Sequence, residues 1–427
     1  MGSNQSLWFL PTVSVVVAII LSIAVVQLDR LRPDIASQFP IVFGGGPEGA
    51  RGMLQAIAST VIASAATTFS ITIVALTLSS SQFSPRVLRT FMGDRANQLV
   101  LATFMATFVY ALLVLRTIRT ANEDGSGAFV PNVAVTGAIL LAVLSLGMLI
   151  YFIHHIATGI QVSKIAAAVA AETLAAAERT FPEARAGLDA HEIDRPSDPL
   201  FGNAPSTVPA LRSGYLADFD TGAIVAAARD ADVILRLGAM PGRWVQKHAP
   251  VFSVWPADRV TNELTEELDR HLTVGDQRSM TQDIGFGIQQ PVDIGTKAIS
   301  PGINDPTTAI TCLDRLGEIL VEVGRRRDRP QGHADDAGQL RLIASFDDWP
   351  ALVDLAFDQL RHFSSGMPIV TAQLVRTLGQ IRSAVPAHRH GALLGQARPV
   401  SDALDQITLE ADRVRVEREL MTLRANP

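Results

Sequence analysis

Residues 53–80 form an uncharged apolar segment in which several hydroxyl side chains share one face. On a helix drawn with 100° per residue, that face spans about 140°. The hydroxyl groups on it belong to Thr60, Ser64, Thr67, Thr68, Thr72 and Ser79, and the apolar residues Ile71, Ala75 and Leu78 lie among them. Hydroxyl oxygens can solvate an ion, so this face is the first candidate for chemistry.

Two interpretations of this face remain open. The hydroxyl groups can bond to carbonyls of their own helix while small residues let neighbouring helices pack closely. Alternatively, the face lines a water-filled path in which Ile71 or Leu78 forms an apolar constriction. The segment contains no ionisable residue, which argues against a proton-coupled transporter or pump.

A second group of polar residues lies in the C-terminal half of the chain. Its members are Arg278, Asp283, Asp293, Lys297, Asn304 and Asp305. These charges could form a catalytic or ligand-binding cluster, or an ion-pair network that orders a turn. Asn304 or Asp305 is also placed to cap a helix that opens at Pro306.

No metal, cofactor or catalytic residue is predicted. The chain lacks zinc-ligand spacing, a nucleophile elbow, and the Walker, Rossmann and kinase motifs. Cys312 is the one cysteine, which excludes an intramolecular disulfide. The expectation is a protein that is not an enzyme, although a reaction using Asp283, Asp293, Lys297 and Asp305 remains a third hypothesis.

Composition indicates a membrane segment followed by a soluble one. The 427 residues are 48% hydrophobic and 18% charged, against about 25% charged in average soluble domains. The net charge of −6 argues against a nucleic-acid partner. Since a spanning helix needs about 20 apolar residues, residues 1–160 are predicted to form a transmembrane domain. Its expected spans are residues 8–28, 53–80, 98–118 and 132–160.

Four spans place both termini on one side of the membrane, and we expect that side to be the cytosol. A cytosolic location avoids translocation of the large C-terminal half. It also agrees with the arginines that follow the second span. Arg86 and Arg89 are expected on a short interfacial helix, at a pore mouth or against lipid headgroups.

The fold class expected overall is mainly α, with the four-helix transmembrane domain followed by a cytosolic α+β domain. We expect a juxtamembrane helix over residues 161–195 and a linker over 196–209. A small β-rich module follows over 210–256, and a mainly helical region fills 257–427. In that last region one helix is expected over residues 399–423, with Leu404, Ile407, Ala411, Val414 and Met421 in the core.

Within the β-rich module, Trp244–Val245 and Val251–Trp255 are expected to form a hairpin. Residues 240–251 resemble the hairpin of biotinyl- and lipoyl-like barrels, so a small barrel-like module is expected there. The sequence lacks a Met-Lys-Met turn, so we interpret the module as structural and not as a cofactor carrier.

Two phrases resemble a bacterial family of predicted membrane proteins of unknown function. They are the Ser80–Arg89 phrase SSQFSPRVLR and the Ala298–Ala309 phrase AISPGINDPTTA, with Phe286-Gly287-Ile288 before the latter. The resemblance covers nearly the whole chain and implies an inner-membrane protein in contact with the lipid bilayer. It implies no substrate and no catalytic residue.

The leading functional hypothesis is a homo-oligomeric ion channel or pore lined by the second span. The C-terminal half would be its cytosolic assembly or sensing domain. The alternative is a membrane-tethered ligand sensor or scaffold without conduction.

Overall fold

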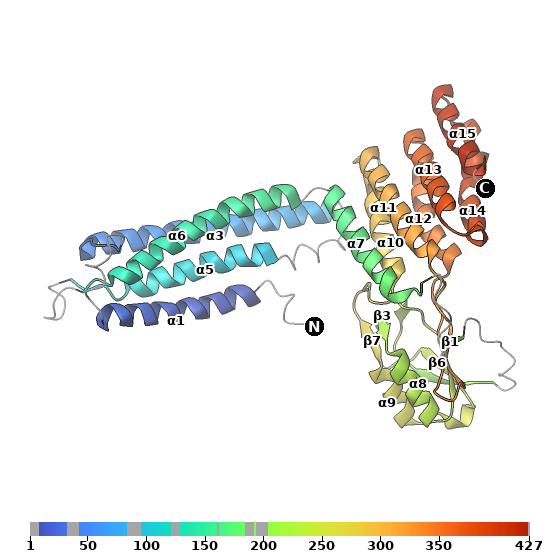
Figure 1. Ribbon diagram of the computed structural model, residues 1–427, viewed down its shortest axis with the longest axis horizontal. Coiled ribbons are helices and arrows are strands. Elements are labelled where there is room, and N and C mark those ends of the chain that lie inside the picture. The colour runs from blue at the N-terminus through green and yellow to red at the C-terminus, as the bar shows by residue number, and fades with distance from the viewer. Residues whose placement is uncertain are drawn as a thin grey trace. The chain divides into compact units, whose positions relative to one another are not determined.

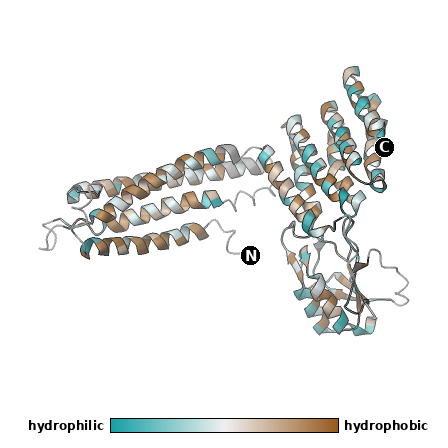
Figure 2. Ribbon diagram, viewed as in Figure 1, coloured by the Kyte–Doolittle hydropathy of each residue, from teal (hydrophilic) through white to brown (hydrophobic). Residues whose placement is uncertain are grey.

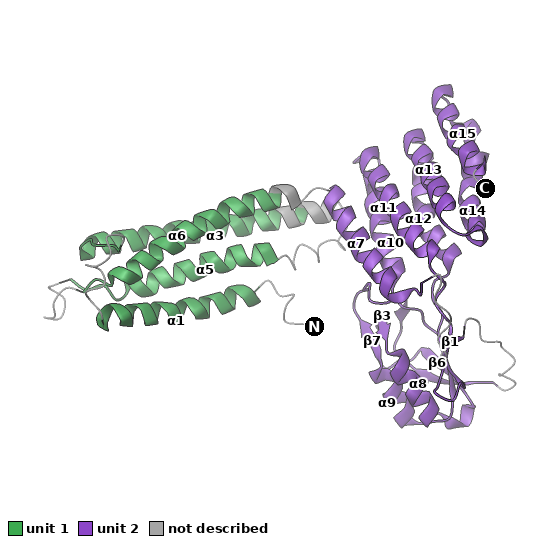
Figure 3. Cartoon of the chain, viewed as in Figure 1, with its two compact units in different colours: residues 1–161 green, residues 162–427 purple. Residues whose placement is uncertain are grey.

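The structure is a computed structural model that describes residues 8–31, 42–82, 95–120, 129–159, 162–183, 192–193 and 204–425. The chain forms two compact units, which we call unit 1 (residues 1–161) and unit 2 (residues 162–427) (Figure 3). Each unit has apolar core clusters of its own.

Four long apolar helices make up most of the described part of unit 1 (Figures 1 and 2). They are α1 (Phe9–Leu31), α3 (Pro47–Gln82), α5 (Arg95–Leu115) and α6 (Asn132–Gly159). All four are long and apolar enough to cross a membrane, as predicted. With 36 residues, α3 is about 54 Å long and exceeds the hydrocarbon thickness of about 30 Å.

Helix α5 packs against α1, α3 and α6, and small side chains fill much of the space between these helices. Ala58, Ala111 and Ala138 are at most 4% exposed. Small residues let the helix backbones approach closely, which is the main source of attraction between helices in lipid. A buried hydrogen bond of 3.0 Å between the hydroxyl groups of Thr107 and Ser145 joins α5 to α6.

The strands described in unit 2 form two open sheets and no closed barrel. The six-stranded sheet has the order β1–β8–β9–β4–β6–β2, and the three-stranded sheet has the order β5–β3–β7. The strands are β1 (Glu192–Ile193), β2 (Ser206–Pro209), β3 (Gly214–Phe219), β4 (Ile234–Leu237), β5 (Trp244–Val245), β6 (Pro250–Trp255), β7 (Leu272–Gly275), β8 (Gly332–Ala334) and β9 (Leu340–Ile343).

Two short helices complete the sheet region: α8 (Thr221–Asp230) and α9 (Asn262–Arg270). Their apolar faces share one core with the strands. The 3₁₀ turn η3 (Ala257–Arg259) precedes α9.

The predicted hairpin of Trp244–Val245 with Val251–Trp255 is wrong. β5 pairs with β3 in the smaller sheet, whereas β6 pairs with β2 and β4 in the larger one. The chain turns between them at His248, whose φ is +69°. The His248 N–H and the Ala249 carbonyl both bond to Ala210, just after β2. These bonds direct the next strand to β2 and away from β5.

The helices of unit 2 stack in two rows (Figure 1). One row contains α10 (Ile284–Ala298), α12 (Trp349–Phe363) and α14 (His390–Asp402), and the other contains α11 (Pro306–Arg325), α13 (Pro368–Ala384) and α15 (Glu410–Ala425). Helix α7 (Val162–Thr180) packs on α10 and α11 at the start of the stack. The short 3₁₀ turns η4 (Ala387–Arg389) and η5 (Leu404–Gln406) flank α14.

The single helix predicted over residues 399–423 is also wrong. Pro399 lies inside α14, and α15 starts only at Glu410. The chain bends at η5, where Leu404 and Ile407 pack against the helical core. The bend turns Val416 and Leu420 inward and leaves Ala411, Val414 and Met421 exposed, so the latter three are not core residues as predicted.

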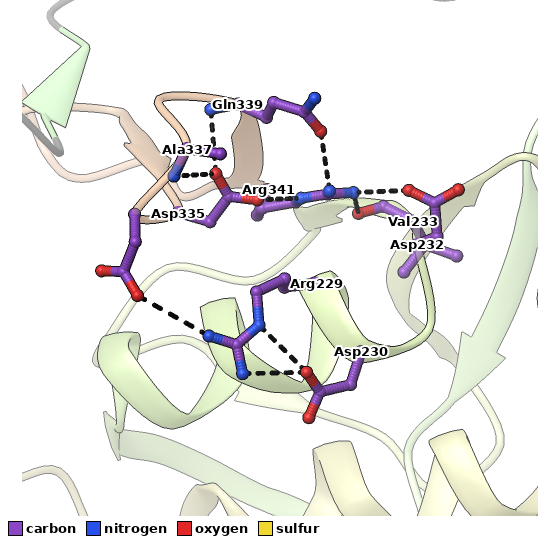
Figure 4. Close-up of polar contacts among 9 residues, drawn as sticks. Arg229, Asp230, Asp232, Val233, Asp335, Ala337, Gln339 and Arg341 are labelled. Atoms are coloured by element: carbon purple, nitrogen blue, oxygen red, sulfur yellow. Dashed lines mark hydrogen bonds and ion pairs between the residues drawn. The ribbon is translucent and has the colours of Figure 1, made fainter.

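A buried ion-pair network fixes the turn between β8 and β9 (Figure 4). Arg341 donates to Asp335 at 2.7 Å and to Asp232 at 3.1 Å. The other Asp335 oxygen accepts from the backbone N–H groups of Ala337 and Gln339. Buried charges are tolerated only when they are paired. The network therefore holds β8 and β9 beside Asp232, which lies just before β4 and is far from both strands in sequence.

The hydrogen bonds from Arg341 and from the backbone hold the pKa of Asp335 below its usual range. Such a carboxylate contributes stability that is fully present above the unfolded-state pKa of about 3.9. That contribution is lost as pH falls through the lower folded-state pKa. We therefore expect Asp335→Asn to lower the melting temperature at pH 7 and to have a smaller effect at pH 3. Tryptophan fluorescence of the full chain measures this, and a difference independent of pH would contradict it.

Candidate functional site

One face of α3 is buried in unit 1 and the opposite face is exposed. Leu54, Ala58, Val61, Ala65 and Thr68 are at most 6% exposed. Their spacing of three and four residues forms one stripe, which packs against α5 and α6. After Leu54, the other described side chains of α3 are half-buried or exposed.

The predicted hydroxyl strip runs across the edge of this buried face. Thr68 is buried and Ser64 and Thr72 are half-buried, whereas Thr60, Thr67 and Ile71 are exposed. The side chains of Leu78 and Ser79 lie outside the described residues, as do Arg86 and Arg89. The strip is therefore neither wholly enclosed by one chain nor wholly on its outside.

Three hydroxyl groups of the strip bond to carbonyls of their own helix, whereas the buried Thr68 hydroxyl has no hydrogen-bond partner among the described residues. Ser64 donates to the Thr60 carbonyl at 2.9 Å and Thr67 to the Ala63 carbonyl at 3.0 Å. Thr72 donates to the Thr68 carbonyl at 2.8 Å. These bonds use the protons and leave the hydroxyl oxygens as acceptors, the groups that would face water or a cation.

The exposed side of α3 also carries a stripe of small residues. We call it the small-residue face; it consists of Gly52, Ala56, Ser59, Ala63, Ala66 and Ser70, all exposed. Their alternating spacing of four and three residues confines them to about 80° of the helix. Thr60 and Thr67 adjoin this face on one side. Between residues 52 and 70, this arc of α3 has no side chain larger than threonine.

The exposed faces of α1 and α6 differ from the small-residue face of α3 because they carry large aliphatic side chains; outside that face, α3 also exposes Phe69, Ile73 and Val74. Examples are Val17 and Ile20 on α1, and Leu140, Val143 and Ile150 on α6, each at least 54% exposed. Large aliphatic side chains suit contact with lipid, whereas small residues mark the contacts between membrane helices.

Asp29 is a buried acidic residue near the end of α1, just beyond the predicted first span. Its side chain is 7% exposed. Its two oxygens accept from the backbone N–H groups of Val133 and Ala134 at 3.0 and 2.9 Å. Asp29 therefore caps the N-terminus of α6 from another helix.

In unit 2, Arg278 and Asp283 form a close pair. The Arg278 guanidinium donates to both Asp283 oxygens at 2.7 and 2.9 Å. Asp283 also accepts from the Phe286 N–H at 3.0 Å and so caps α10. Gly242 lies against this carboxylate, and a Cβ at Gly242 would be 2.0 Å from it.

The other residues of the predicted polar cluster lie farther along the chain and are not joined to this pair. Asp293 accepts from Gln289 at 2.7 Å within α10, and Lys297 is in the last turn of that helix. Asp305 caps α11 by accepting from the Thr308 hydroxyl at 2.6 Å and from its N–H at 3.1 Å. The Thr308 hydroxyl lowers the pKa of Asp305. Asn304 has a φ of +50° in the turn before α11.

The 15 residues of α10 separate Asp283 from Asp305, a length of about 22 Å. The cluster is therefore three local arrangements, two of which cap helices. Burial raises the pKa of the Cys312 thiol to about 12, which disfavours the thiolate form at neutral pH. Within the described ranges, no three His, Cys, Asp or Glu side chains are placed to hold a metal ion.

Comparison with known proteins agrees with this architecture. Residues 4–380 match the family described as "Predicted membrane protein (DUF2254)". Uncharacterized proteins of Mycobacterium bovis and Mycobacterium tuberculosis are each 32% identical to the chain over 421 residues. Each alignment covers 96% of this chain and 78% of the relative. No solved structure matches the chain. The chain therefore belongs to this family of predicted membrane proteins, and its four apolar helices fit an integral membrane protein.

Proposed function

We propose that the protein is a homo-oligomeric pore of the bacterial inner membrane, with α3 at its centre. Neighbouring copies contact one another through the small-residue face, and Thr60, Thr67 and Ile71 face the axis. Residues 162–427 lie in the cytosol as an assembly or sensing domain. Ions are the expected permeant species.

The observation that carries this proposal is the exposed arc of α3 between residues 52 and 70. It has no side chain larger than threonine, in contrast to the aliphatic faces of α1 and α6. A face of this kind gains little from contact with lipid tails but allows close approach of another helix. The adjoining threonine oxygens can act as acceptors for a hydrated cation.

The alternative is a membrane-tethered ligand sensor or scaffold without conduction. The hydrogen bonds of Ser64, Thr67 and Thr72 to carbonyls of α3 favour it, because hydroxyl groups bonded in this way need no water. In that case the small-residue face is a dry contact between copies.

The replacement Thr67→Val separates the two functions because it removes the hydroxyl group and leaves the size of the side chain unchanged. If Thr67 contacts the permeating ion, the loss of one hydrogen bond costs about 1.4 kcal/mol per subunit. Ion flux into proteoliposomes should then fall about tenfold or more, while the oligomer mass in detergent stays the same. Thr103→Val on α5 removes a hydroxyl with a similar carbonyl bond and should leave flux unchanged.

A second replacement tests the assembly. Ala63→Leu places a bulky side chain on the small-residue face and should reduce the oligomer to smaller species in light-scattering measurements. Wild-type protein that is monomeric in detergent and lipid would contradict the pore. An oligomer that shows no ion flux under voltage, tension or changed pH would exclude the pore and favour the sensor or scaffold without conduction.

A further inference from the structure

Unit 2 contains a cavity of about 660 Å³ with mainly polar walls. The end of α7, the start of α8, the segment from Arg326 to Pro330, β8 and Phe346 all contribute to its lining. Its volume falls in the range of about 300–1,000 Å³ that is typical of small-molecule sites. No residue predicted from the sequence as a site residue lines it.

Arg329 is the residue of this cavity with an unusual environment. Its guanidinium lies 3.4 Å from the centre of the Phe346 ring. It donates one hydrogen bond, of 2.9 Å, to the Gln282 carbonyl. Among the described residues, no carboxylate lies within ion-pair distance of it. Since a guanidinium has five N–H donors, several remain available for a ligand.

The deeply buried arginines of unit 2 have a different arrangement. Arg341 pairs with Asp335 at 2.7 Å and Arg389 pairs with Asp328 at 2.8 Å. Arg326, which lines the same cavity as Arg329, pairs with Glu322 at 2.7 Å. Arg329 is half-buried, and a partly desolvated cation without a carboxylate partner at ion-pair distance favours an anion beside it.

The nearby acidic groups attract Arg329 only from beyond ion-pair distance and do not occupy its N–H donors. Asp283 pairs with Arg278, and Asp218 accepts from the Phe219 N–H at 2.9 Å. Burial lowers the pKa of Arg329 to about 10, and both aspartates act on it only through longer-range attraction. The guanidinium therefore keeps its charge at neutral pH.

Other groups in the wall modulate the charge of the cavity. Thr221, the first residue of α8, also lies at the wall, but the Asp220 carboxylate already caps that helix by accepting from the Ala223 N–H at 3.0 Å, which offsets the helix dipole there. Arg179 and His333 add basic groups, while the exposed side chains of Glu178 and Glu183 add negative charge. The acidic side chains disfavour a highly charged polyanion and favour a small ligand with one phosphate or diphosphate group.

We propose that this cavity is a binding site for a small phosphorylated molecule whose phosphate oxygens pair with the Arg329 guanidinium. When the flat face of a guanidinium lies on an aromatic ring, its N–H donors remain free around the edge of the group. That geometry matches phosphate oxygens two at a time. The site is independent of whether α3 lines a pore.

Inorganic pyrophosphate is the probe, added to the full chain in detergent at pH 7.5. At ten times its Kd, a ligand stabilises the folded protein by about 1.4 kcal/mol. Pyrophosphate should therefore raise the melting temperature reported by the tryptophans of unit 2. Sodium chloride at equal ionic strength should not do so.

Two variants locate the effect. Arg329→Gln should bind pyrophosphate at least about tenfold more weakly in calorimetry, because it loses a charged hydrogen-bonded pair. Arg270→Gln is the matched control, since Arg270 is an exposed arginine that pairs with Glu267 and does not line the cavity, and it should keep the affinity of the wild type. Equal affinity in Arg329→Gln and wild type would overturn the proposal.

A measurement on the wild-type chain tests the proposal if the Arg329→Gln variant does not fold. Phenylglyoxal modifies accessible arginines, and mass spectrometry reports each site. Pyrophosphate should protect Arg329 at least about tenfold, the factor set by occupancy at ten times Kd, and should leave the exposed Arg270, which does not line the cavity, unprotected. Modification of Arg329 that is insensitive to pyrophosphate would refute the proposal.

Discussion

Replacing Asp283 by alanine is expected to lower the free energy of unfolding of unit 2 by about 3–5 kcal/mol, the usual cost of removing one member of a buried ion pair. Asp283 is 3% exposed and holds both Arg278 and the first turn of α10. Without it, a guanidinium that is only 21% exposed loses its partner. Because domains are stable by about 5–15 kcal/mol, this loss is a large fraction of the total.

Asp305→Ala is the matched control, because Asp305 caps the next helix but has no arginine partner among the described residues. Loss of a simple cap costs about 1 kcal/mol. Urea unfolding of the full chain in detergent, followed by tryptophan fluorescence, compares the two; three of the four tryptophans, Trp244, Trp255 and Trp349, lie in unit 2. Equal destabilisation by the two variants would show that the Arg278 pair contributes nothing beyond capping.

Replacing Asp29 by alanine is expected to destabilise unit 1 by several kcal/mol. The side chain bridges α1 and α6 by accepting two backbone N–H groups. Each buried donor left unpaired costs about 1–3 kcal/mol, and lipid offers no substitute partner. The fraction of protein that remains monodisperse after heating, measured by size-exclusion chromatography, should fall sharply.

Asp29→Asn tests whether the loss of the two acceptor oxygens causes the destabilisation expected for Asp29→Ala. Asparagine retains one carbonyl oxygen and can accept from Val133 or Ala134, but its amide group cannot accept from the other. The thermal stability of Asp29→Asn should therefore lie between those of wild type and Asp29→Ala. A variant as stable as wild type would mean that water already reaches the α6 terminus.

The sequence alone determined those features that depend on short-range chemistry. Apolar runs predicted four spans, because crossing a bilayer requires a continuous stretch of apolar residues. The cap of α11 was also readable, since Asp305 and the Thr308 N–H lie within one turn. The strip of hydroxyl groups on α3 followed from its periodicity for the same reason.

The tertiary structure decided which groups lie inside and which are paired. Strand β9 joins β4 across more than a hundred residues, and the bond that Asp29 accepts from Ala134 spans a separation of 105 positions. Neither contact leaves a local pattern in the sequence. Likewise, periodicity placed Thr67 and Thr68 on one face, yet packing of α5 and α6 buries Thr68 and leaves Thr67 exposed. Burial and ion pairing depend on neighbours brought together by folding, so the unpaired charge of Arg329 became visible only in three dimensions.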